Sequence, residues 1–157
     1  EAGLPLYGHD LNDTTTPAMA DLGFAVAKRR REAADFPGAA SILIELNQGP
    51  PLTRLGFIVE GRQPVRENVE LFDGDRSVGF VTSGGHSPCL GQPIGMALLE
   101  ENWAKTGLTL EAEVRGKRVP VKTVPMPFVP HRYHRAISRQ AKPDGSDIAP
   151  HQTKGAK

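Results

Sequence analysis

The sequence has very little cysteine and no long apolar run. Cys89 is the only cysteine among 157 residues, which excludes an internal disulfide and favours a reducing compartment such as the cytosol or the mitochondrial matrix. No apolar stretch approaches the roughly 18 to 20 residues that cross a bilayer, and the residues after Glu1 have no signal-peptide pattern. The sequence therefore predicts a soluble protein that is not secreted.

The sequence also has no excess of charge of one sign. Lysine and arginine total 19 against 18 acidic residues. This balance gives no general reason to expect a nucleic acid or an anionic membrane as a partner. Partners must therefore be inferred from local sites.

The first 48 residues have a mixed α/β pattern. A start signal at Thr14–Pro17 predicts a short helix over 18–22, and alternating residues predict a strand over 23–31. An apolar stripe then predicts a second helix over 39–46. We expect this region, 1–48, to end at a linker beginning at Gln48.

From residue 52 to about 129 the pattern is almost entirely β. Asp73-Gly74 and Arg115-Gly116 each separate two short apolar runs, which is typical of hairpins. The Gly84-Gly85 pair lies in VTSGGHSP, which we interpret as a strand end and a tight turn. The sequence thus predicts an α+β protein whose region 49–134 is a small antiparallel β-barrel.

The last residues are poor in apolar side chains. Residues 141–157 have no periodicity and are rich in proline, glycine and lysine. Such a segment buries too little surface to order itself, so we expect a disordered tail over 135–157.

Two groups of side chains suggest ligand chemistry. Four adjacent cations at Lys28–Arg31 can bind an anion through arginine forks, although short basic runs are more often solvated surface. Two histidine-containing pairs could bind zinc, but their spacing beside proline makes this a weak signal. The residues of these pairs are His86 with Cys89 and His131 with His134. We interpret Cys89 as a small buried residue rather than a nucleophile.

Several motifs resemble the aminomethyltransferase T-protein of the glycine cleavage system, in the same order and with similar spacing. The resemblance extends from Glu1 to about Tyr133 and is most specific in the first 38 residues. The motifs are EAGLPLYGHDL, TTP, GFAVAKRRR, DFPGA, VTSGGHSP and MPFVP.

The resemblance implies an activity and a domain plan. Residues 1–48 would be the end of a folate-binding domain, and the β region would be the separate C-terminal barrel. The family enzyme takes an aminomethyl group from the lipoyl arm of H-protein, releases ammonia and forms 5,10-methylenetetrahydrofolate. Tetrahydrofolate and H-protein are therefore the implied partners, with no metal.

The resemblance also implies binding residues. Glu1 matches a glutamate on the pterin ring, Arg30 matches a position contacting folate, and Tyr133 matches a tyrosine that closes the pocket from the barrel side. The family's catalytic aspartate precedes the position of Glu1, so no catalytic residue is expected here. We interpret the chain as a C-terminal fragment and expect it to be inactive alone.

Three alternatives remain open from the sequence. The first is the folate-binding region of a sarcosine- or dimethylglycine-dehydrogenase-like protein. The second is a non-enzymatic folate-binding protein of the same superfold, linked to iron–sulfur maintenance, whose KGC and GQE signatures do not occur between Gly23 and Arg66. The third is a barrel interaction module without a ligand, which fold alone does not exclude.

Overall fold

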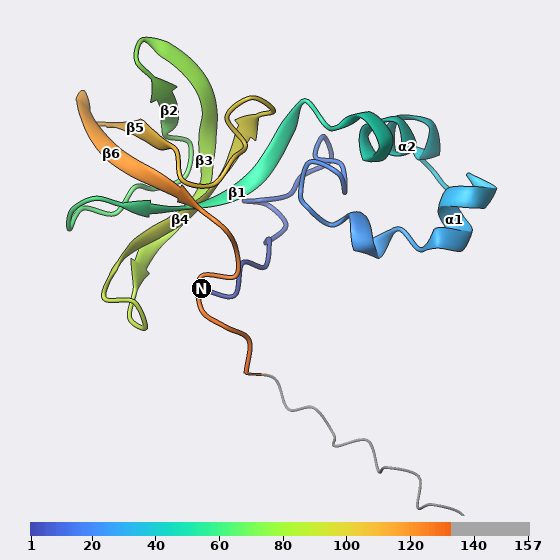
Figure 1. Cartoon of the computed structure of the whole chain (residues 1–157), viewed down its shortest axis with the longest axis horizontal. Coiled ribbons are helices and arrows are strands. Elements are labelled where there is room, and N and C mark those ends of the chain that lie inside the picture. The colour runs from blue at the N-terminus through green and yellow to red at the C-terminus, as the bar shows by residue number, and fades with distance from the viewer. Residues whose placement is uncertain (133–157) are drawn as a thin grey trace, which may run out of the picture.

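The structure, a computed structural model, describes residues 1–132. In this part of the chain six strands form a closed antiparallel barrel in the order β1-β4-β3-β2-β5-β6, and β1 pairs with β6 to close it (Figure 1). The predicted α+β fold with a small β-barrel is confirmed. The strands are β1 (Leu52–Val59), β2 (Glu70–Asp73), β3 (Arg76–Ser87), β4 (Gln92–Glu100), β5 (Thr109–Val114) and β6 (Lys117–Val124).

Both predicted hairpins are present. β2 and β3 join through a turn at Gly74, whose φ is +59°, and β5 and β6 join through Arg115-Gly116. The latter turn has φ of +52° and +72°, the mirror-image geometry that matches the twist of paired strands. The inward positions of β5, Leu110 and Ala112, are buried in the barrel core. The period-two pattern therefore placed these strands and their inner faces correctly.

The Gly84-Gly85 pair lies inside β3, so its interpretation as a tight turn was wrong. A Cβ atom on Gly84 would lie 2.0 Å from the carbonyl oxygen of Val65, which only glycine avoids. Glycine at this position lets the β1–β2 loop cross the strand closely. The turn lies farther on, between β3 and β4.

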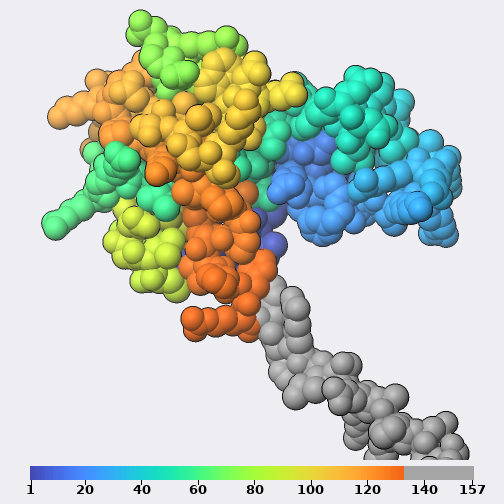
Figure 2. Space-filling view, viewed as in Figure 1, coloured from blue at the N-terminus to red at the C-terminus, as the bar shows by residue number. Residues whose placement is uncertain are grey.

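The region before the barrel contains three helical elements among its described residues: η1 (Gly23–Ala25), α1 (Lys28–Ala33) and α2 (Ala39–Gln48). The predicted helix over 39–46 is confirmed as α2. Figure 2 shows these residues as a lobe beside the barrel. No strand longer than an isolated bridge occurs in residues 1–51 of the structure, so the mixed α/β pattern is here helical and irregular.

Two local predictions in this region were wrong. Residues 18–22 form turns rather than a helix, and residues 23–31 form η1 and the start of α1 rather than a strand. Phe24 is 81% exposed and has no neighbouring strand to pack against. Arg31 instead donates from Nε to the Val26 carbonyl oxygen at 2.8 Å, and it also contacts the Gly23 carbonyl oxygen. These bonds satisfy backbone acceptors within the helical turns.

A buried arginine, Arg54 on β1, joins the N-terminal segment to the barrel. Only 4% of Arg54 is exposed. Its Nε donates to the carbonyl oxygen of Ala20 at 2.9 Å and its Nη1 to that of Gly3 at 2.8 Å. Its backbone N–H donates to the Met19 carbonyl oxygen at 2.7 Å. Burial lowers the pKa of Arg54, and the charges of Asp10 and Asp21 oppose this.

The predicted disordered tail over 135–157, like Tyr133 and His134, lies outside the described residues. The division of the chain at residue 48 remains a prediction, although β1 begins close to it at Leu52.

We expect Arg54→Leu to lower the free energy of unfolding by about 3 kcal/mol, because it leaves the buried Ala20 carbonyl oxygen and the partly buried Gly3 carbonyl oxygen without this donor. Urea unfolding followed by circular dichroism would measure this. Arg62→Leu, at an exposed position of the β1–β2 loop, should change the value by less than about 0.5 kcal/mol. Equal effects of the two substitutions would contradict the tethering role of Arg54.

Candidate functional site

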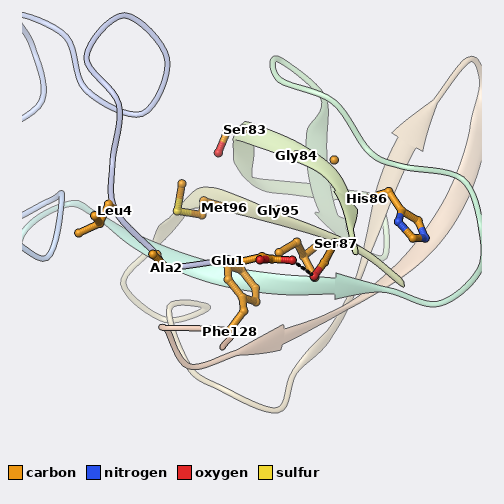
Figure 3. A pocket seen from close by; sticks show the side chains of 13 residues that line it. Glu1, Ala2, Leu4, Ser83, Gly84, His86, Ser87, Gly95, Met96 and Phe128 are labelled. Carbon is orange, nitrogen blue, oxygen red and sulfur yellow. Dashed lines mark hydrogen bonds between the residues drawn. The ribbon is translucent and has the colours of Figure 1, made fainter. Parts of the chain in front are cut away.

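A cleft of about 460 Å³ lies where the N-terminal segment crosses the β3–β4 end of the barrel (Figure 3). Three discontinuous parts of the chain form it: the first four residues, strands β3 and β4, and the segment after β6. Its lining residues are Glu1, Ala2, Gly3, Leu4, Ser83, Gly84, Gly85, His86, Ser87, Ile94, Gly95, Met96 and Phe128. We call it the Glu1 cleft.

The backbone of Glu1 is fixed by the segment that follows β6. Its carbonyl oxygen accepts hydrogen bonds from the N–H groups of Phe128 at 3.0 Å and Val129 at 3.2 Å. Phe128 in turn packs against Gly56 on β1, where an added Cβ would lie 2.8 Å from the ring and 2.8 Å from Met126. Glycine at position 56 therefore makes room for Met126 and for Phe128, which lines the cleft.

The carboxylate of Glu1 points toward the β3–β4 turn (Figure 3). Its Oε1 accepts from the Ser87 hydroxyl at 2.6 Å and from the Cys89 N–H at 3.1 Å. The Ser87 bond, followed by the Cys89 bond, lowers the pKa of Glu1 to about 2, so this carboxylate is ionised at neutral pH. The Cys89 side chain also forms a hydrogen bond with the Glu1 carboxyl group, which contributes to this lowering.

Arg30 lies in a different place. Its Nη1 is 2.7 Å from Oδ1 of Asp35, and both side chains are about half exposed. It lines a separate cleft of about 390 Å³ formed with η1, α1 and the start of α2, which includes Phe36 and Ile42. The structure therefore does not bring Arg30 and Glu1 into one cleft, and Tyr133 lies outside the described residues. The binding roles of these three residues remain predictions.

Neither a metal nor a reactive thiol is indicated near the Glu1 cleft. In residues 1–132 no group of three or more His, Cys, Asp or Glu side chains could hold a metal ion. Cys89 is exposed, so its interpretation as a buried residue was wrong. The neighbouring Glu1 raises the pKa of the Cys89 thiol, which disfavours the thiolate that a nucleophile needs.

Sequence reasoning missed several residues of the cleft. Ser87 and Phe128 had no assigned role, and Cys89 was considered only as a zinc ligand, a nucleophile or a buried residue. The two glycines of VTSGGHSP were the available signal, because glycine inside a strand indicates a bulge or a close approach. Pairing of Glu1 with residues almost ninety positions away has no local sequence signal.

Comparison with known proteins identifies the barrel. Residues 53–130 match the family model of the glycine cleavage T-protein C-terminal barrel domain. The chain is 40% identical over 136 residues to the mitochondrial aminomethyltransferase of Solanum tuberosum, and 42% identical over 137 residues to that of Gallus gallus. These matches cover 86% and 87% of this chain but 33% and 35% of the relatives.

A solved structure agrees with these matches. The glycine cleavage system aminomethyltransferase T from Bartonella henselae superimposes with a TM-score of 0.81 at 39% identity, covering 85% of this chain and 37% of that one. Fold and cleft thus define a barrel domain with an N-terminal ligand-sized cleft. The chain belongs to the glycine cleavage T-protein family and spans about a third of the length of its curated relatives.

None of the helices in the described part of the chain is long and apolar enough to cross a membrane.

Removing the Ser87 hydroxyl should raise the pKa of Glu1 toward its usual 4.5. A pKa that is lower in the folded state stabilises the fold above the unfolded value, and this contribution is lost as pH falls through about 2. Carbon-13 NMR titration of the Glu1 carboxyl should therefore show an ionised group at pH 4 in the parent chain and partial protonation in Ser87→Ala. Ser83→Ala, in the same cleft but not bonded to Glu1, should match the parent.

Proposed function

We propose that this chain is part of a tetrahydrofolate-dependent aminomethyltransferase of the glycine cleavage system. The whole enzyme would move the one-carbon unit from aminomethyl-dihydrolipoyl H-protein to tetrahydrofolate and release ammonia. The observation that carries the proposal is the ionised Glu1 carboxylate in a ligand-sized cleft of a T-protein barrel. Its working compartment would be the mitochondrial matrix or the bacterial cytosol.

Glu1 would bind and orient the pterin ring. An ionised carboxylate can accept a pair of N–H donors from the aminopyrimidinone edge, and such charge-assisted bonds are stronger than neutral ones. Ser87 and Cys89 hold the carboxylate in place and keep it deprotonated. Phe128 would supply an apolar wall against a flat ring.

No residue of this chain is assigned a chemical step. The family resemblance places the catalytic aspartate before Glu1, and Arg30, held by Asp35, would contribute to folate binding only when that ion pair rearranges. Residues 1–48 would be the end of the folate-binding domain. The residues described here would therefore position folate, while the reacting groups are brought by other parts of the enzyme.

Isothermal calorimetry with tetrahydrofolate tests the binding role. Glu1→Gln should weaken binding about tenfold, because it removes a charged acceptor of two hydrogen bonds. Glu32→Gln, an exposed carboxylate on α1, is the matched control and should have no effect. Absence of tetrahydrofolate binding, or equal affinity of the Glu1→Gln variant, would overturn the assignment of this cleft to folate.

A second measurement tests whether the 157-residue chain is catalytically active by itself. With aminomethylated H-protein and tetrahydrofolate, the isolated 157-residue chain should form no 5,10-methylenetetrahydrofolate. Detectable turnover would show that this chain carries a catalytic group of its own.

A further inference from the structure

Two methionine sulfurs contact the buried Arg54 guanidinium beside the Glu1 cleft. Nη1 of Arg54 donates to Sδ of Met96 at 3.1 Å and to Sδ of Met126 at 3.7 Å. The same nitrogen donates to the Gly3 carbonyl oxygen at 2.8 Å. These three acceptors share one nitrogen, and a thioether sulfur is the weaker kind of acceptor. A stronger acceptor at either sulfur would therefore compete with the Gly3 carbonyl oxygen.

Met96, on β4, is the methionine that lines the Glu1 cleft (Figure 3). Met126 is packed between two glycines instead. A Cβ on Gly3 would lie 2.9 Å from the Cβ of Met126, and a Cβ on Gly56 would lie 2.8 Å from its Cγ. Both methionines are partly buried, but the cleft gives a small oxidant a path to Met96.

A thioether that a peroxide can reach is converted to a sulfoxide. The sulfur has two lone pairs, so the bond to Arg54 leaves one that can attack a peroxide oxygen. The O–O bond breaks as the S–O bond forms, the sulfur loses two electrons, and the other oxygen leaves with the remaining proton as water. The product oxygen is a strong acceptor, and its bond to a guanidinium is charge-assisted.

We propose that Met96 is a modification site, at which a peroxide forms a sulfoxide whose oxygen displaces the Gly3 carbonyl oxygen from Arg54 and releases the segment that carries Glu1. The modification does not depend on which ligand the cleft binds. It is reversible, because methionine sulfoxide reductases restore the thioether.

The effect on Glu1 follows from the short distance along the chain. Gly3 is two residues after Glu1, so the loss of its bond to Arg54 frees the backbone next to the carboxylate. The Glu1 carbonyl oxygen would still accept from Phe128 and Val129. The carboxylate, however, would be held less firmly against Ser87, whose bond is the main cause of the low pKa of Glu1. Oxidation of Met96 should therefore raise this pKa.

Peptide mapping tests the site of oxidation. The folded 157-residue chain is treated with a limited amount of hydrogen peroxide and analysed by mass spectrometry. The sulfoxide should appear at Met96 before Met19 or Met126, neither of which lines the Glu1 cleft. Treatment in concentrated urea should remove this order, because unfolding exposes all three sulfurs. Earlier oxidation of Met19 or Met126 in the folded chain would overturn the assignment of the site.

Carbon-13 NMR titration of the Glu1 carboxyl tests the consequence. In the oxidised parent chain its pKa should rise from about 2 toward 4.5. Met96→Leu, a substitution of similar volume, should keep a pKa of about 2 before and after the same treatment. This variant retains Cys89, and dithiothreitol after the treatment reverses mild thiol oxidation but not a sulfoxide, so an effect of the thiol is separated from that of Met96.

A second variant and a reversal complete the test. Met126→Leu should respond to peroxide as the parent does, since it retains Met96. Methionine sulfoxide reductases A and B together should return the pKa of Glu1 in the oxidised parent to about 2. An unchanged pKa in a chain with fully oxidised Met96, or an equal rise in treated Met96→Leu, would show that Met96 does not control the position of Glu1.

Discussion

The arrangement of this protein depends on the burial of one positive charge. Arg54 projects from β1 against the N-terminal segment and binds two of its carbonyl oxygens through the side chain. Burying a guanidinium is costly unless its donors are satisfied, so the segment that carries Gly3 and Ala20 must remain on the barrel. Asp10 adds a second link, since its buried carboxylate accepts from Thr82 on β3 at 2.5 Å. These links add to the hydrogen bonds that Phe128, Val129 and Ser87 make to Glu1, and together they hold the N-terminal segment against β3.

Glycines on the strands determine how closely other segments of the chain pack against the barrel. Gly56 admits Phe128 against β1, and Gly84 admits the β1–β2 loop that carries Arg66. Gly95 on β4 similarly lies where a Cβ would be 2.3 Å from the ring of Phe57. At each of these positions the absence of a side chain lets another part of the chain approach the strand closely. The shape of the cleft therefore depends on how closely neighbouring segments pack against the barrel strands.

The sequence predicted the barrel well and the site only partly. Alternation and turn residues are local signals, so they located β5, β6 and the hairpin at Gly74. The region 18–31 was mispredicted because its conformation is set by Arg31 bonding to backbone carbonyls and by the absence of a neighbouring strand, neither of which is encoded in periodicity. Glu1 was identified only through family resemblance. Its partners on the β3–β4 turn follow from the fold and could not be derived from spacing.

The charges in this part of the protein show that an arginine in a basic run is not necessarily available to a ligand. Arg30 belongs to the densest basic run, yet Asp35 already pairs with it. Arg66 is an isolated arginine in a loop, but His9 occupies the nearby Glu67 and leaves Arg66 without a counter-ion among residues 1–132. Because an exposed ion pair is weak, a ligand carboxylate gains most where no internal carboxylate competes.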